Sequence, residues 1–176
     1  MTNKAFTLVE LLVVILILGI LSAIVIPQYH KAIWRSKTKG MLFNLKAMYE
    51  GVHSYYLANN TYPTKLSDLD ISFNGYTNTC IRSGPLYTND SCVANENSNL
   101  FLSVVNNYAS GASFAQFNSG PYRSAGFMIN YKGGISCYES TSYITTTGNF
   151  CEKVMGCRIW ASASDQWDKY FKCPDL

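Results

Sequence analysis

The chain has 176 residues, which is long enough for one ordinary domain and short for two. Its formal net charge is only +3, and no dense basic cluster lies outside residues 31 to 39. The charge gives little support for nucleic-acid binding, and we expect none.

Residues 6 to 27 are predicted to form a membrane-spanning helix. Leu11 to Pro27 carry no charge, and the segment is close to the roughly 20 residues that span a bilayer. It is apolar on all sides, which suits lipid better than the core of a soluble domain. A secretory signal peptide is the main alternative, but only Lys4 is basic in the flank, and the best cleavage position, near Ala23, lacks a small residue two positions earlier.

Two residues weaken the helix inside this apolar run. Gly19 costs roughly 1 kcal/mol relative to alanine, and Pro27 has no N–H and crowds the carbonyl of Ala23. We expect the helix to kink or loosen there. Helices in lipid also tolerate such residues, so the residues alone leave open whether the weakness has a function.

Residues 28 to 58 are predicted to continue the helix as an amphipathic segment. Its apolar positions recur at alternating spacings of four and three, with flanking positions seven apart. They are Met41, Leu45, Met48, Val52 and Tyr55, flanked by Leu42, Tyr49 and Tyr56. One rod from residue 6 to 58 would be ~80 Å long.

The membrane orientation is predicted from two opposing signals. Four basic residues follow the span, and this asymmetry alone would place the carboxyl side in the cytoplasm. They are Lys31, Arg35, Lys37 and Lys39, whereas only Lys4 precedes the span. The cysteines beyond the helix favour an oxidising compartment, and we adopt that orientation.

The amino-terminal stretch resembles the type IV prepilins, a family that includes type IV pilins and pseudopilins. The resemblance rests on a short leader with a basic residue, the motif that follows it, and the position of two helix-weakening residues and one aromatic residue. These are Lys4, Phe6-Thr7-Leu8-Val9-Glu10, Gly19, Pro27 and Tyr29. The close match covers about 30 residues of the chain.

The resemblance implies processing of the chain. Residues 1 to 5 would be a leader that a prepilin peptidase removes between Ala5 and Phe6, and the same enzyme would methylate the new Phe6 amine. The family usually has glycine before the cut, whereas this chain has Ala5.

Glu10 is then understood as an assembly residue. A charge in a membrane core costs at least a few kcal/mol, and the helix dipole offsets a fraction of that cost near the helix start. The hypothesis is that Glu10 of one subunit pairs with the Phe6 amine of its neighbour and sets the register of a filament. The alternative is that Glu10 reaches the lipid headgroups.

The region beyond the helix is predicted to be a sheet-containing head. Phe114–Phe117, Gly126–Tyr131 and Gly134–Tyr138 have the composition of strands, and residues 132 to 134 that of a hairpin turn. Leu100–Val105 is a further strand or a short helix. The alternation between positions 126 and 131 suits a sheet with one face covered, and the amphipathic stripe is the expected cover.

The predicted fold class is therefore α+β, a long amino-terminal helix whose carboxyl-terminal half packs on an antiparallel sheet of about four strands, with a disulfide-stapled head. The resemblance to type IV pilins implies the same architecture. The predicted segments are a helix-to-sheet loop region at 59–100, the sheet at 101–150, and a cysteine-rich carboxyl-terminal region at 151–176.

All six cysteines lie beyond the helix, and their even number predicts disulfides. They are Cys80, Cys92, Cys137, Cys151, Cys157 and Cys173. Six cysteines allow 15 connectivities, and we favour nearest-neighbour pairing because each bond then closes a short loop, worth about 3 kcal/mol in the chain-entropy model. The resemblance implies that the segment from Cys137 to Cys173 builds an exposed edge of the head.

The sequence favours a structural protein over an enzyme. We find no catalytic constellation, no metal motif and no cofactor motif. The expected function is a pilin that polymerises through its helix into a type IV pilus for adhesion, motility or uptake. Alternatives are a type II secretion pseudopilin or a minor tip pilin that acts as a binding module.

The resemblance also implies partners and a location. The expected partners are further copies in a helical filament, other pilins, an inner-membrane assembly platform and the prepilin peptidase. Before assembly the subunit would sit in the bacterial inner membrane with its head in the periplasm, and after assembly in a cell-surface pilus.

Overall fold

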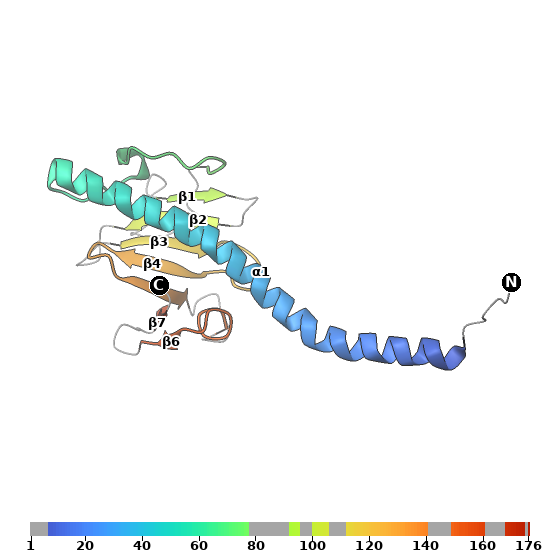
Figure 1. Cartoon of the computed structure of the whole chain (residues 1–176). Helices are drawn as coiled ribbons and strands as arrows, with labels where there is room; N and C mark the ends of the chain where they lie inside the picture. The colour runs from blue at the N-terminus through green and yellow to red at the C-terminus, as the bar shows by residue number, and fades with distance from the viewer. Residues whose placement is uncertain are drawn as a thin grey trace. The chain divides into compact units, whose positions relative to one another are not determined.

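The computed structural model describes residues 7–77, 92–95, 100–105, 112–140, 149–160, 168–174 and 176. These residues form a long helix, a short 3₁₀ turn (η1, Leu66–Asp68) and the strands of one sheet (Figure 1). The chain divides into two compact units, residues 1–37 and 38–176.

Helix α1 (Leu8–Asn59) begins in the first unit and is continuous through Gly19 and Pro27. Every large hydrophobic side chain from Leu8 to Ile26 is exposed. Among the described residues, α1 is the one helix long and apolar enough to cross a membrane, with a mean hydropathy of 3.1 over its most apolar stretch. The predicted apolar span is therefore present, and none of the residues that the structure describes covers it.

The helix ends where the sequence predicts. The N–H of Asn60 donates to the carbonyl of Tyr56 at 2.8 Å and closes the last turn. Asn60 then adopts a φ of 53°, in the left-handed region that asparagine tolerates better than most residues.

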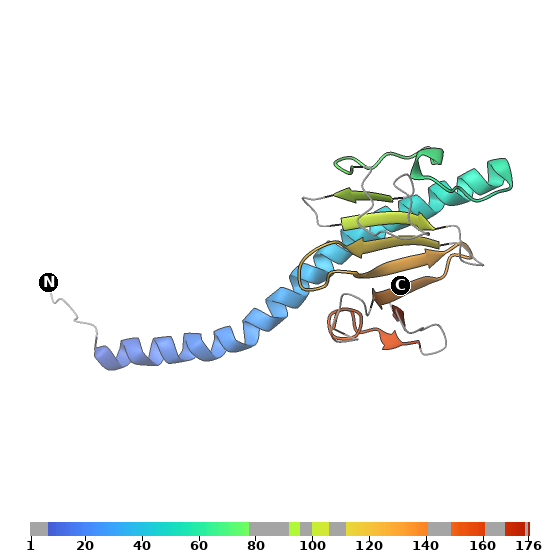
Figure 2. The same ribbon diagram turned by 180° about the vertical axis from the view of Figure 1, so that it is seen from behind.

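The second half of α1 belongs to the head and buries the predicted stripe. Its buried residues recur at spacings of three and four, and all of them except Thr38 belong to the predicted stripe. They are Thr38, Met41, Leu45, Met48 and Val52. Tyr55 is only half-buried. Figures 1 and 2 show this half of the helix lying across one face of the sheet, which is the predicted packing of helix on sheet.

The sheet is antiparallel throughout, and within the described residues it has seven strands in the order β1-β2-β3-β4-β5-β7-β6. The strands are β1 (Cys92–Asn95), β2 (Leu100–Val105), β3 (Ala112–Phe117), β4 (Ala125–Asn130), β5 (Ile135–Ser140), β6 (Arg158–Ile159) and β7 (Asp168–Lys172).

The prediction of about four strands is therefore wrong in number, although the α+β class is confirmed. Strands β1, β6 and β7 were missed because they are short and are defined by pairing with other strands rather than by an alternating pattern; β1 and β6 lie at the two edges of the sheet, and β7 lies between β5 and β6. Residues 100 to 105, left open as strand or helix, form β2.

The expectation that only one face of the sheet is covered is also wrong. All six residues of β3 are buried, and five of the six in β5. One face carries Phe127 and Ile129, and the other carries a cluster built around Phe114, Tyr138 and Tyr170. Strands buried on both faces lose the clean polar alternation that marks a half-exposed sheet.

The turn between β4 and β5 confirms the predicted hairpin. Gly133 has a φ of +85°, which favours glycine, and its N–H donates to the carbonyl of Asn130 at 2.8 Å. The side-chain oxygen of Asn130 accepts from the N–H groups of Lys132 at 3.1 Å and Gly134 at 2.8 Å. These bonds set the register that pairs Met128 with Ser136.

Candidate functional site

A capping box formed by Thr7 and Glu10 starts helix α1. The N–H of Glu10 donates to Thr7 Oγ1 at 3.3 Å, and the N–H of Thr7 donates to Glu10 Oε2 at 2.8 Å. The Thr7 hydroxyl also donates to Glu10 Oε2 at 2.7 Å. Two of the backbone donors that a helix start leaves unpaired are thus satisfied reciprocally.

The capping box gives the conspicuous acid of the apolar run a local role. An unpaired backbone N–H in lipid costs several kcal/mol, so a carboxylate that accepts from this helix start offsets part of its own desolvation. The signal was present in the sequence as Thr7-x-x-Glu10, the standard capping-box spacing, and sequence reasoning missed it.

One oxygen of Glu10 remains available. All three hydrogen bonds between Thr7 and Glu10 use Oε2 or the Thr7 hydroxyl, and within the described part of the chain Oε1 receives no hydrogen bond. The carboxylate can therefore accept from a further cation without breaking the cap. The predicted partner, Phe6, and the predicted cleavage residue, Ala5, lie outside the described residues.

Gly19 opens a shallow apolar groove on the surface of the exposed helix. A Cβ atom added at Gly19 would meet nothing within 4 Å. The groove is lined by Leu12, Ile15, Leu16, Gly19, Ile20 and Ala23. A groove of this kind admits the ridge of another apolar helix. The predicted loosening at Gly19 and Pro27 stays a prediction, because it concerns a helix that is packed among the helices of other subunits.

Two disulfide bonds tie the carboxyl-terminal part of the head to the sheet. Cys137 on β5 bonds Cys151 with a Cα–Cα distance of 5.9 Å, and Cys157 bonds Cys173 at 4.2 Å. Both agree with nearest-neighbour pairing. Cys92 is also disulfide-bonded, and its predicted partner, Cys80, lies outside the described residues.

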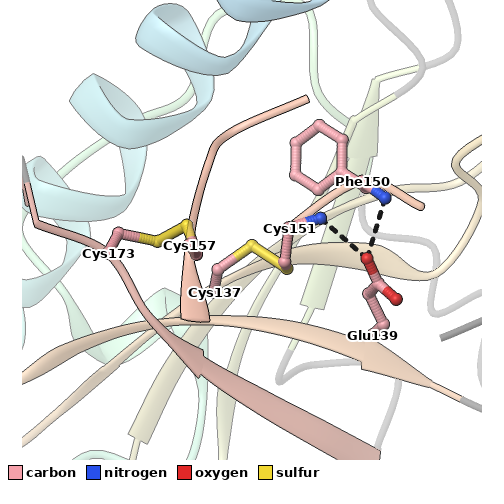
Figure 3. The surroundings of a disulfide bond; sticks show 6 residues. All are labelled: Cys137, Glu139, Phe150, Cys151, Cys157 and Cys173. Atoms are coloured by element: carbon pink, nitrogen blue, oxygen red, sulfur yellow. Dashed lines mark hydrogen bonds between the residues drawn. A yellow bond between two sulfur atoms is a disulfide. The ribbon is translucent and has the colours of Figure 1, made fainter. Parts of the chain in front are cut away.

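The buried side chain of Glu139 accepts hydrogen bonds from the same region. Glu139 is 1% exposed, and its Oε1 accepts from the N–H groups of Phe150 at 2.8 Å and Cys151 at 2.7 Å (Figure 3). An acceptor in a buried place is costly to lose, because the donors that it satisfies would be left without water or another partner. Sequence reasoning missed Glu139, since its only signal is its place two residues after Cys137 on the same strand face.

The segment that Glu139 holds is a single helical turn with a defined end. The N–H of Gly156 donates to the carbonyl of Glu152 at 3.0 Å, and the N–H of Cys157 to the carbonyl of Cys151 at 2.8 Å. The bond from Gly156 to the carbonyl four residues earlier is the αL capping pattern, and Gly156 has a φ of +76°. The ring of Phe150 then packs against the sheet, with its centroid 5.3 Å from that of Phe117.

Comparisons with known proteins match the amino-terminal part of the chain. Residues 1–26 match the family described as the prokaryotic N-terminal methylation motif. The chain is 43% identical over 60 residues to the type IV major pilin protein PilA of Myxococcus xanthus, which covers 34% of this chain and 27% of that protein. No solved structure matches.

Further relatives come from two classes of assembly. The chain is 50% identical over 40 residues to the type IV major fimbrial protein FimA of Dichelobacter nodosus, covering 23% of this chain and 26% of that protein. It is 37% identical over 68 residues to the type II secretion system core protein G of Pseudomonas aeruginosa, covering 39% of this chain and 48% of that protein. The chain thus spans a quarter to a half of the relatives it matches.

Proposed function

By its amino-terminal segment the chain belongs to the type IV pilin and pseudopilin family, and we propose that it is a pilin, a structural subunit that polymerises through α1 into a type IV pilus. The observation that carries the proposal is the fully exposed apolar half-helix, which starts with Glu10 in a capping box and lies within the matched methylation motif. Such a surface requires lipid or other apolar helices as its surroundings. Two of the relatives are named as a major pilin and a major fimbrial protein, which favours a non-enzymatic role.

The proposal includes processing of the amino terminus. A prepilin peptidase removes residues 1 to 5, cutting between Ala5 and Phe6, and the new Phe6 amine is methylated. Mass spectrometry of the native protein tests this step directly. A mature chain that starts at any residue other than Phe6 contradicts it.

Assembly then relies on Glu10 and Phe6. The Oε1 atom of Glu10 accepts the amine of Phe6 from a neighbouring subunit, while Oε2 keeps its bonds to Thr7. The attraction between these opposite charges is strong in a low-dielectric filament core, so it sets the axial register of each added subunit. The groove at Gly19 receives a neighbouring helix, and the stretch from Gly19 to Pro27 loosens as helices pack.

The proposed location follows from the same helix. Before assembly α1 crosses the bacterial inner membrane with the disulfide-bonded head in the periplasm, and an inner-membrane assembly platform transfers the subunit to the pilus. Other pilins join the same filament.

Electron microscopy of filaments sheared from cells, labelled with an antibody against this chain, tests the function. We expect label along the shafts, and its loss in cells that carry Glu10→Ala. The matched control is Glu50→Ala, which removes an exposed acid of the same helix outside the apolar run. Absence of the chain from every sheared filament contradicts the proposal.

The similarity to core protein G favours a second candidate, a type II secretion pseudopilin. It would share α1 and Glu10 but form a short periplasmic filament. The same cells separate the two functions, since a pseudopilin mutant loses secreted enzymes while its surface pili persist.

A further inference from the structure

Two disulfide bonds share one sulfur cluster at the edge of the sheet. The Sγ atoms of Cys137, Cys157 and Cys173 all lie within 4.8 Å of one another, although Cys137 is bonded to Cys151. Figure 3 shows the two bonds next to each other above the strands. Each bond therefore has a sulfur atom of the other bond as a neighbour.

Strand register creates this cluster. Cys137 on β5 is paired with Phe171 on β7, and Cys173 follows two residues after Phe171, so both cysteines point to the same face. One further step along the β6–β7 ladder, which pairs Arg158 with Lys172, places Cys157 opposite Cys173. The three sulfurs are thus brought together by hydrogen-bonded strands.

The four cysteines differ in their exposure. Cys137 and Cys151 have no exposed surface and Cys157 only 2%, whereas Cys173 is half-buried. Cys173 is thus the most exposed of the four residues, and we expect a thiol reagent to react there first. Access decides which sulfur of a disulfide is attacked.

We propose that these two bonds form a thiol–disulfide exchange relay that carries reduction from Cys173 inward to the Cys137–Cys151 bond. This inference concerns the head and does not rest on the proposed function. A thiolate of an external dithiol attacks Cys173 Sγ, which breaks the Cys157–Cys173 bond and releases the Cys157 thiolate. That thiolate attacks Cys137 Sγ, forms a Cys137–Cys157 bond and releases the Cys151 thiolate.

The second thiol of the dithiol completes the balance. It attacks the mixed disulfide, which releases the Cys173 thiolate and leaves the reagent as a cyclic disulfide. The two protons of the dithiol end on Cys151 and Cys173, so two electrons have reduced one net disulfide. The turn at residues 149–157 then stays bonded to Cys137 on β5 through Cys157 instead of Cys151, loses its bond to Cys173, and keeps the hydrogen bonds from its Phe150 and Cys151 N–H groups to Glu139.

Limited reduction of the full-length wild-type protein in detergent tests the relay. Dithiothreitol is added for increasing times, exchange is stopped with acid, free thiols are alkylated, and peptides are mapped by mass spectrometry. We expect a partly reduced species in which Cys151 and Cys173 are alkylated and Cys137 is linked to Cys157. The proposal is overturned if Cys157 and Cys173 are alkylated while the Cys137–Cys151 bond stays intact at every time.

A variant tests the central step without any reductant. Cys173→Ser leaves Cys157 as a thiol beside Cys137, and we expect both the Cys137–Cys151 and the Cys137–Cys157 bond in the purified protein. The matched control is Cys92→Ser, which removes a bonded cysteine on β1 at the other end of the strand order; there both described bonds should stay intact. Cys137–Cys151 as the sole bond of Cys137 in the first variant, or equal scrambling in the control, refutes the relay.

Discussion

The Oε1 atom of Glu139 lies 2.7 Å from the backbone nitrogen of Cys151, in the same turn that a disulfide joins to β5. Glu139 and Cys137 are two residues apart on that strand and face the same side. The turn is therefore fixed twice, by one covalent bond and by a pair of hydrogen bonds to one buried side-chain oxygen. This explains how a segment without a regular helix stays packed on the sheet.

Removal of the Glu139 carboxylate should destabilise the head. Glu139→Ala leaves the two N–H groups of Phe150 and Cys151 without their acceptor, and we expect the free energy of unfolding to fall by about 2–4 kcal/mol. Glu139→Gln keeps one acceptor oxygen and should cost about half as much. Urea unfolding of the full chain in detergent, followed by near-ultraviolet circular dichroism, measures both.

The control for Glu139 lies in the turn itself. Glu152 is exposed, so Glu152→Ala should change the free energy of unfolding by no more than about 0.5 kcal/mol. If Glu139→Ala and Glu152→Ala lower the free energy of unfolding equally, the buried carboxyl group does not stabilise the head beyond what the disulfide contributes.

A leucine-to-alanine change at a buried and at an exposed position of α1 distinguishes the contribution of packing from that of helix propensity. Leu45 has no exposed surface and Leu57 is 72% exposed. Leu45→Ala should lower the free energy of unfolding by about 2–5 kcal/mol, because it leaves a cavity between the helix and the sheet. Leu57→Ala should stay within about 0.5 kcal/mol of the wild type. The same urea titration compares them, and similar losses would refute the packing of this helix half on the sheet.

The capping box predicts a local effect at the start of α1. Thr7→Ala removes the oxygen that accepts from the N–H of Glu10, so hydrogen exchange at that amide should become roughly two- to tenfold faster. Thr7→Ser retains an acceptor and should leave the rate unchanged. Nuclear magnetic resonance of the mature chain in micelles gives both rates. Identical rates in the two variants would show that the side chain of Thr7 does not cap the helix.

The parts of the molecule that could be predicted from the sequence are those marked by a pattern among neighbouring residues. The stripe of Met41, Leu45, Met48 and Val52 follows from helical spacing, and the hairpin at Gly133 follows from its glycines. Strand β6 is two residues long, and no local pattern distinguishes it from a loop. It forms because its backbone pairs with β7, a strand that comes later in the chain.

The functional residues divide in the same way. Glu10 stood out because an acid in an apolar run is rare, yet its capping partner Thr7 went unnoticed among apolar neighbours. Glu139 carries no such contrast in sequence, since its burial results from the packing of a distant turn. The role of a charged residue can be predicted when its surroundings are formed by its neighbours in sequence, as for Glu10. It cannot be predicted in this way when residues far along the chain bury it, as for Glu139.

Tyr131 follows strand β4 and combines close stacking with an unpaired hydroxyl. Its ring lies 4.0 Å, between centroids, from the ring of Tyr62. Its hydroxyl is buried and has no hydrogen-bond partner among the described residues. Burial, and secondarily the nearby Tyr62, raises the pKa of Tyr131 well above the ordinary value of 10.0.

Tyr131 should therefore make the head sensitive to alkaline pH. Above pH 10 the unfolded chain releases the Tyr131 proton while the folded chain keeps it, so the unfolded state binds fewer protons and the free energy of unfolding falls as pH rises. Tyr131→Phe keeps the stacking, removes the unpaired hydroxyl and should add about 1 kcal/mol at pH 7. Unfolding titrations from pH 7 to 11 should give parallel curves for the two proteins below pH 9 and a shallower alkaline loss for the variant. Parallel curves up to pH 11 would show that the Tyr131 hydroxyl ionises in the folded head as readily as in the unfolded chain.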